Sequence, residues 1–207
     1  MCRKAWGFES PLPHFVVRKL RKSWTKVYKL LHKLLNYGLR DSIIDNTQFE
    51  FIDFIEPDRD SHGQVIEYSP ASRYANRNRL PLNKYGKGPF CRFRIRVTSS
   101  LNTIGVYAIT DGNKKDLYIG KCTGITSTLA KRFNYGYGSI QPRNCYERGQ
   151  STNCRINRLV LEAVKNGERL SLFFHKCKNS QNTTDLEARI ISRIGKPPWN
   201  IQEPFPL

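Results

Sequence analysis

The feature that most constrains this chain is a pair of short apolar segments separated by a turn sequence. Residues 105–109 and 117–121 are rich in the β-branched and aromatic residues that favour strands. Between them lie Asp111, Gly112 and Asn113, which are residue types that turns prefer. The two segments predict an antiparallel β-hairpin, on which Tyr107 and Tyr118 can converge.

Helical and strand patterns follow this hairpin. We expect a helix that begins near Ser127 or Thr128, and further helices at residues 156–164 and 186–194. The apolar run at 170–174 predicts another strand between those two helices.

Three features precede the hairpin. Apolar residues at helical spacing predict a helix over 15–37, and residues 50–68 predict a β-hairpin with its turn at 58–63. Strict alternation over 91–97 predicts a half-buried strand with arginines on its open face. The opposite side of the first helix carries a basic stripe: Arg18, Lys22, Lys26, Lys29 and Lys33. Such a stripe suits a helix that lies along phosphates, and a solvated face of a packed helix is the alternative.

The charge of the chain indicates an anionic partner. The 35 Lys and Arg residues exceed the 17 Asp and Glu residues and give a net charge of +18. Nucleic acid is the first candidate for the partner, and an acidic membrane surface is the second. No apolar run reaches the roughly 18 residues that span a bilayer, and no secretory segment is evident. We therefore expect a cytoplasmic protein of a prokaryotic cell, with no membrane partner. Its six cysteines, which form no C-x-x-C pair, are expected to be reduced thiols.

An ordered set of residues lies in the second half of the chain. Gly105-Val106-Tyr107 and Tyr118-Ile119-Gly120 are followed by Lys121, by Arg132, by Glu187 and by Asn200 after two prolines. This set resembles the GIY-YIG nuclease superfamily over about residues 91–202. The stretch 135–154 is similar to the branch of that superfamily that contains small type II restriction endonucleases.

The resemblance implies an α+β fold. Its core is a three-stranded antiparallel sheet flanked by helices, here with an N-terminal basic helix and a β-hairpin extension. The corresponding segments are a basic helical arm at 1–48, a hairpin and basic loop at 49–90, and the nuclease core at 91–207.

The resemblance also implies roles in phosphodiester hydrolysis. Glu187 would be the carboxylate that holds Mg²⁺, for which Mn²⁺ could substitute, and Arg132 would hold the scissile phosphate. Tyr107 would orient or deprotonate the attacking water, with Tyr118 beside it, and Lys121 would lower the pKa of the phenol or position the nucleophile. Relatives place a His or Tyr four residues after the arginine, but that position is Gly136 here, so Tyr135 and Tyr137 both remain candidates. Asn200 would hold the sheet and the metal-binding helix together.

Ordinary structural roles remain open for the same residues. Thr184-Asp185-Leu186-Glu187 matches a capping box, in which Glu187 satisfies its own helix terminus. The tyrosines are also common sheet residues, and Arg132 would be unremarkable on an exposed helix in so basic a chain.

The implied activity is a metal-dependent DNA endonuclease, most similar to a type II restriction enzyme that cuts duplex DNA at a short site. One such site makes one nick, so a double-strand break implies a homodimer. A restriction role would also imply a cognate DNA methyltransferase acting on the same site. The alternatives are a repair or mobile-element nuclease of the same superfamily and a non-catalytic nucleic-acid-binding protein. Candidate DNA-binding residues are Lys22, Lys26, Lys29, Arg77, Arg79, Lys84, Lys87, Arg92, Arg94, Arg148, Gln150 and Asn153.

Overall fold

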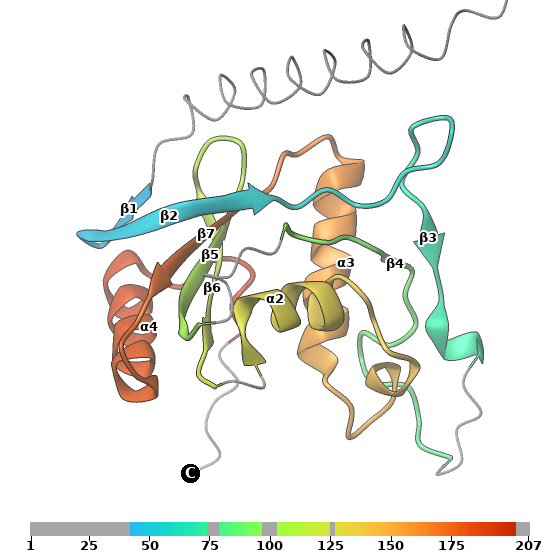
Figure 1. The fold of residues 1–207 in the computed structure, drawn as a ribbon. Helices are drawn as coiled ribbons and strands as arrows, with labels where there is room; N and C mark the ends of the chain where they lie inside the picture. Colours follow the sequence, from blue (N-terminus) through green and yellow to red (C-terminus); the bar gives the residue numbers. More distant parts are fainter. Residues whose placement is uncertain (1–41, 74–78, 97–102, 125–126, 202–207) are drawn as a thin grey trace, which may run out of the picture. The chain divides into compact units, whose positions relative to one another are not determined.

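A five-stranded antiparallel sheet organises the part of the chain that this computed structural model describes, residues 42–73, 79–96, 103–124 and 127–201 (Figure 1). The strand order is β1-β2-β7-β5-β6. The strands are Ser42–Ile44 (β1), Thr47–Phe54 (β2), Gly105–Thr110 (β5), Asp116–Cys122 (β6) and Ser171–Lys176 (β7). The predicted hairpin is confirmed as β5 and β6, and the predicted strand at 170–174 is β7, which pairs with β5.

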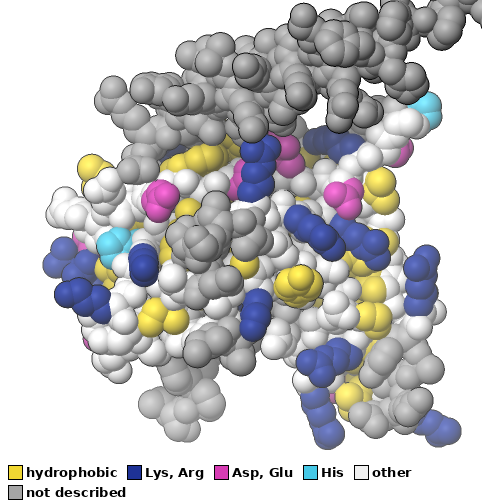
Figure 2. Space-filling model, viewed as in Figure 1, with side chains coloured by type: hydrophobic (Ala, Val, Ile, Leu, Met, Phe, Trp, Pro, Cys, Tyr) yellow, Lys and Arg dark blue, Asp and Glu magenta, His cyan; other side chains and the backbone are white. Residues whose placement is uncertain are grey.

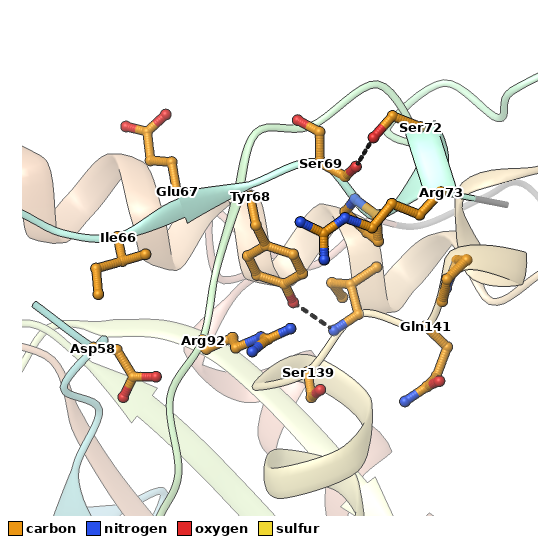
Figure 3. Close-up of a pocket in the computed structure, with 13 residues that line it drawn as sticks. Asp58, Ile66, Glu67, Tyr68, Ser69, Ser72, Arg73, Arg92, Ser139 and Gln141 are labelled. Atoms are coloured by element: carbon orange, nitrogen blue, oxygen red, sulfur yellow. Dashed lines mark hydrogen bonds between the residues drawn. The ribbon is translucent and has the colours of Figure 1, made fainter.

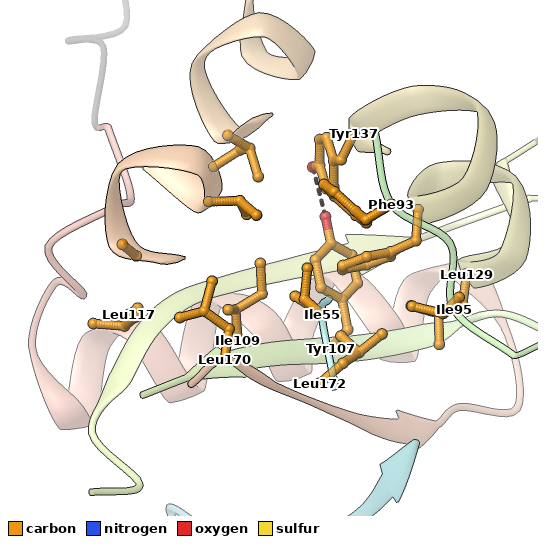
Figure 4. Close-up of a cluster of buried hydrophobic side chains, with 14 of the residues drawn as sticks. Ile55, Phe93, Ile95, Tyr107, Ile109, Leu117, Leu129, Tyr137, Leu170 and Leu172 are labelled. Atoms are coloured by element: carbon orange, nitrogen blue, oxygen red, sulfur yellow. Dashed lines mark hydrogen bonds between the residues drawn. The ribbon is translucent and has the colours of Figure 1, made fainter. Parts of the chain in front are cut away.

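Helices cover both faces of this sheet. On one face lie α2 (Leu129–Lys131), a π-helix (Arg132–Tyr137) and α3 (Ser151–Lys165), and on the other lies α4 (Ser180–Ile194). Because side chains alternate along a strand, β5 contributes Tyr107 and Ile109 to the first core and Val106 and Ala108 to the second. Figure 4 shows part of the first core. The α+β class is therefore confirmed.

The sheet has two more strands than the three expected of the core, and the predicted hairpin over 50–68 is wrong. β2 pairs with β1 and β7, whereas β3 (Glu67–Tyr68) pairs with β4 (Phe90–Cys91). The physical reason is a tighter turn nearby: Asp45 and Asn46 have φ of 47° and 58°, a two-residue turn that these residue types tolerate well. The turn at 58–63 closes only a small loop, through a bridge between Arg59 and Val65.

The predicted alternation over 91–97 is confirmed as far as residue 96, but most of that segment is not part of a strand ladder. Cys91, Phe93 and Ile95 are buried, whereas Arg92, Arg94 and Arg96 are exposed. From the end of β4 onward, side-chain amides and the carbonyl of Gly138 take the place of a neighbouring strand. Asn157 of α3 bonds both the N–H and the C=O of Cys91, at 2.9 and 2.7 Å, and Asn134 bonds the N–H of Ile95 at 2.8 Å.

Several predictions fall outside the described residues: the helix at 15–37 with its basic stripe, including Lys22, Lys26 and Lys29, and also Arg77. Residues 41–207 group as one compact unit. The predicted segments end at residues 48 and 90, and β2 continues across the first of these boundaries. Both boundaries stay predictions. Within the described ranges, no helix has the length and apolarity to cross a membrane, and the five cysteines there are buried free thiols.

Candidate active site

Tyr107 lies at the centre of a cluster of three tyrosines. Its side chain is buried in the middle of β5, and its hydroxyl is 2.8 Å from the hydroxyl of Tyr137 (Figure 4). The ring of Tyr118 lies 6.0 Å from that of Tyr107 and 6.4 Å from that of Tyr137, between centroids. We call Tyr107, Tyr118 and Tyr137 the tyrosine cluster. The predicted convergence of Tyr107 and Tyr118 is thus what the structure shows.

The two motif glycines leave room for this cluster and for the sheet. Gly120 of β6 lies opposite Tyr107 of β5, and a Cβ at Gly120 would stand only 2.5 Å from both Cζ and Oη of Tyr107. A Cβ at Gly105 would stand 2.6 Å from the ring of Phe174 and would also overlap the carbonyl oxygen of His175. Glycine is required at both positions because other atoms fill the space that a side chain would take.

A π-helix decides which of the two later tyrosines joins Tyr107. Its hydrogen bonds run from residue i+5 to residue i, as in the 2.6 Å bond from the N–H of Gly138 to the carbonyl of Phe133. The wider turn therefore brings Tyr137, five residues after Arg132, above the arginine, with the Arg132 Cζ 5.8 Å from its ring centroid. Gly136, at the four-residue spacing, is bypassed, and Tyr135 remains 67% exposed outside the cluster.

Glu187 reaches the same place from the other face of the sheet. Its Oε2 lies 2.8 Å from Nζ of Lys121, with the two side chains 18% and 35% exposed. Lys121 projects from the face of β6 opposite to Tyr118 and Gly120, because side chains alternate along a strand. The site thus spans both faces of β6, an edge strand of the sheet.

The capping-box interpretation of Glu187 is wrong. α4 begins at Ser180, well before the predicted start at 186, and its N-cap is Asn179, whose side chain accepts from the N–H of Asn182 at 2.8 Å. Glu187 therefore lies in the interior of the helix, where its own helix end makes no demand on the carboxylate.

These side chains line one pocket of about 350 Å³. All five residues predicted to be catalytic contribute to it, together with Tyr137 and the start of α3: Tyr107, Tyr118, Lys121, Arg132, Glu187, Tyr137, and residues 149–153. The Nε of Arg132 is buried and, among the described residues, has no hydrogen-bond partner. The guanidinium also lines the pocket, and a permanently charged group there can bind an oxyanion that enters.

The pKa of Tyr107 is raised, whereas the sequence-based expectation is a lowered pKa. Burial raises the pKa of this phenol well above its usual value, and the neighbouring phenols of Tyr137 and Tyr118 raise it further. Lys121 was expected to lower this pKa, but its ammonium group pairs with Glu187 instead. Tyr107 is therefore a neutral hydroxyl at physiological pH, able to orient a water molecule by hydrogen bonding and unsuited to remove a proton from it.

The donor set suits magnesium better than a metal that needs a protein cage. Glu187 is the carboxylate in the pocket, and the described residues contain no group of three His, Cys, Asp or Glu residues that could hold a metal ion. Mg²⁺ commonly keeps several waters and binds one or two carboxylates together with phosphate oxygens. One carboxylate beside a guanidinium in the same pocket fits that pattern.

The other predicted residues lie at varied distances from this pocket. Gln150 and Asn153 line it, and Arg148 is exposed close by in the chain, with a φ of 64°. Both side-chain hydrogen bonds of Asn200 go to Ile119 of β6, at 2.9 and 2.7 Å. Asn200 thus fastens the C-terminal segment to the sheet, and these bonds do not include the expected link to the helix of Glu187.

The remaining basic candidates are exposed elsewhere on the described surface. They are Arg79, Lys84, Lys87, Arg92 and Arg94. Figure 2 shows Lys and Arg side chains scattered over one face of the molecule. Arg92 stacks over Tyr68, 4.8 Å from the ring centroid, in a larger pocket of about 610 Å³ (Figure 3). That pocket contains none of the predicted catalytic residues.

Two features of the site lie outside the sequence predictions: the buried amides and the start of α3 at Ser151. Asn157 and Asn134 hold residues 91–95 against the helices, and Asn157 also donates to the carbonyl of Tyr137 at 2.6 Å. α3 begins at Ser151 rather than near residue 156, which places residues 149–153 in the pocket. The available signal was the polar run Gln150-Ser151-Thr152-Asn153 ahead of the apolar periodicity, because such residues favour helix starts.

Comparison with known proteins gives one finding. Endonuclease II of Enterobacteria phage T4 is 26% identical over 166 residues, which cover 75% of this chain and 93% of that protein. No family model and no solved structure matches the chain. The chain is thus a distant homologue of a nuclease, in agreement with the class that its motif residues resemble.

Proposed function

We propose that this protein is a magnesium-dependent DNA endonuclease that hydrolyses phosphodiester bonds. The observation that carries the proposal is the convergence of three groups in one pocket: the tyrosine cluster, the guanidinium of Arg132 and the carboxylate of Glu187. The distant similarity to a phage endonuclease and the net charge of +18 support the same class of activity and a polyanionic substrate.

Each group has a role that follows from its chemistry. Arg132 holds the scissile phosphate, since its guanidinium lines the pocket and its charge does not titrate. Tyr107 and Tyr137 share a hydrogen bond, so their hydroxyls are held in place to orient a water molecule for attack. Glu187 would hold Mg²⁺, and the bound ion would supply a water of lowered pKa and neutralise charge that develops on the phosphate.

The role of Lys121 follows from its ion pair with Glu187. Its ammonium group lies 2.8 Å from the carboxylate that would hold the metal, so it holds the Glu187 side chain in place when no cation is bound. If Glu187 held Mg²⁺, the ammonium group of Lys121, which lines the same pocket, would bind a phosphate oxygen instead.

The finer proposal is site-specific cleavage of duplex DNA, as in a type II restriction enzyme acting as a homodimer. It rests on the similarity of residues 135–154 to that branch, and on Arg148, Gln150 and Asn153, which have side chains suited to base edges, at or near the pocket. A methyltransferase that protects the same site would follow from this activity.

The test uses purified protein with unmethylated plasmid and phage DNA, with and without Mg²⁺, and compares the wild type with Glu187→Gln. Glutamine keeps the size and a hydrogen bond to Lys121 but removes the charge, so we expect cleavage to fall by at least about 100-fold while DNA binding persists. Glu162→Gln is the matched control, because Glu162 is an exposed carboxylate in a surface ion pair with Arg158.

The products discriminate between the candidate functions. Discrete fragments from unmethylated DNA support restriction, nicks confined to branched substrates support a repair or mobile-element nuclease, and tight binding without cleavage identifies a non-catalytic binder. Undiminished cleavage by Glu187→Gln would contradict the metal-binding role.

A further inference from the structure

A second pocket adjoins the candidate active site on the far side of Arg132. It has a volume of about 390 Å³ and shares Arg132, Gln150 and Asn153 with the first pocket. We call it the flanking pocket, and the lining residues that matter here are Lys131, Arg132, Tyr135, Arg143, Gln150 and Asn153. Because three residues border both pockets, a chain bound in one can continue into the other.

The flanking pocket has the charge of an anion site. Lys131, Arg132 and Arg143 line it, and none of the described residues that line it is acidic. Lys131 and Arg143 are exposed, so their charged groups can reach a ligand without unfolding the surface. Two cations beyond Arg132 match a polymer that carries a further phosphate on the next nucleotide.

Tyr135 adds an aromatic surface to the lining of the same pocket. It comes from the same π-helix as Arg132 and Tyr137, but its side chain is 67% exposed whereas that of Tyr137 is 1% exposed. An exposed aromatic ring beside cations is the arrangement on which single nucleic-acid bases stack. The π-helix thus presents its arginine and one tyrosine to the first pocket and the other tyrosine to the second.

An amide pair forms the border between the two pockets. Nδ2 of Asn153, which is buried, donates to Oε1 of Gln150 at 2.8 Å, and this bond holds the exposed Gln150 side chain in place. The Nε2 donors of Gln150 can then meet a base edge or a phosphate oxygen without first losing conformational freedom.

We propose that the DNA strand that carries the scissile phosphate continues into the flanking pocket, where the adjacent nucleotide stacks on Tyr135 and its phosphate lies between Lys131 and Arg143. The proposal rests on the proposed endonuclease function. A base that stacks on a protein ring has left the stack of its own duplex, so the enzyme acts on DNA that is locally opened beside the cut. Cleavage is accordingly fastest where the adjacent base pair opens easily.

The experiment places the fluorescent base 2-aminopurine at successive positions of duplex oligonucleotides around the bond that the wild-type protein cuts. Binding is measured in the Glu187→Gln protein, and Tyr135→Ala and Tyr135→Phe are made in that background and in the active protein. Ile43→Ala is the control for an exposed apolar side chain, and Lys176→Gln is the charge control for Arg143→Gln.

We expect a change in fluorescence at the nucleotide next to the cleaved bond, lost in Tyr135→Ala and kept in Tyr135→Phe, which can still stack. Tyr135→Ala should weaken binding and raise KM by about 10- to 100-fold, and Tyr135→Phe should stay within about threefold of the parent. Arg143→Gln should lower the slope of log affinity against log salt by about one, and Lys176→Gln should not.

The result that overturns the proposal is equal fluorescence and equal binding in the parent, Tyr135→Ala and Tyr135→Phe. A loss of binding in both Tyr135 variants would also overturn it, because the phenylalanine keeps the ring. These readings do not depend on turnover, so they are separate from failure of the endonuclease function. That failure would appear as DNA left intact by the wild-type protein, and the fluorescence would then be scanned along the whole bound strand.

Discussion

Gly120→Ala tests how the motif glycine positions Tyr107. The added Cβ would stand 2.5 Å from Cζ and Oη of Tyr107 and 2.9 Å from its Cε2. Favourable contacts between carbon atoms lie at about 3.5–4.0 Å, so the ring or the strand must move by about 1 Å. Tyr107 has little freedom to move. The ring of Phe133 packs edge-on against its ring, with 5.2 Å between the centroids, and the hydroxyl of Tyr137 shares a hydrogen bond with its hydroxyl.

The expected magnitude has two parts. Overpacking of this kind typically destabilises by about 1–3 kcal/mol, and we expect a loss in that range in urea unfolding. A displacement of about 1 Å at a reacting group can cost about 100-fold in rate, so nicking of supercoiled plasmid should fall more than stability alone would require.

Gly112→Ala is the matched control in the same hairpin. Its added Cβ would meet nothing closer than the Arg169 carbonyl oxygen at 3.9 Å, and its φ is not positive. We expect this control to be neutral or slightly stabilising, and Gly120→Ala in a Tyr107→Ala background to lose most of its own cost. The reasoning is refuted if Gly120→Ala unfolds and cleaves like Gly112→Ala, or if its cost is undiminished when the Tyr107 ring is absent.

Two further predictions concern buried polar groups. Asn157→Ala leaves the N–H and C=O of Cys91 and the C=O of Tyr137 without this partner, so unfolding free energy should fall by about 3 kcal/mol or more in urea titration. A loss below about 1 kcal/mol, or one no larger than that of Arg158→Ala on the exposed side of the same helix, would contradict this. Burial raises the pKa of Tyr107, so near pH 10 the unfolded chain releases the phenol proton while the folded protein retains it. The free energy of unfolding should therefore fall above about pH 10, and it should fall less steeply in Tyr107→Phe. Equal slopes of unfolding free energy against pH between 9 and 11 in both proteins would show that Tyr107 ionises freely.

Local sequence signals predicted the elements that local interactions determine. The β5–β6 hairpin follows from a turn in which Asp111 accepts from the N–H groups of Asn113 and Lys115, all within five residues. The start of α2 is equally local, because Thr128 accepts from the N–H of Lys131 at 3.4 Å. The catalytic candidates were predicted from residue types in a fixed order along the chain, which match a family motif. Those residues line the pocket.

Features that depend on contacts between residues far apart in the sequence could not be predicted from local patterns. The apolar run at 51–55 fits either a hairpin with 65–68 or a place beside β7, and only the packing of the whole sheet selects the second. The π-helix depends on Asn134 and Gly138 bonding to residues 93–95, some 40 positions away. Without that turn, no spacing rule separates Tyr137 from Tyr135. The pairing of Lys121 with Glu187 likewise joins a strand and a helix that meet only in the folded chain.

The position of the pocket around β6 means that its two halves belong to different hydrophobic cores. Tyr107 packs with α3 and the π-helix, whereas the helix of Glu187 packs through Leu186 and Ile190 on the opposite face. One strand is the spacer between them, and its thickness sets how far the carboxylate stands from the phenols. Substitutions within either core would therefore act as remote adjustments of one half of the site against the other. A polypeptide that lacked either helical layer would keep only the pocket residues of the other layer, on a sheet with one face open to water.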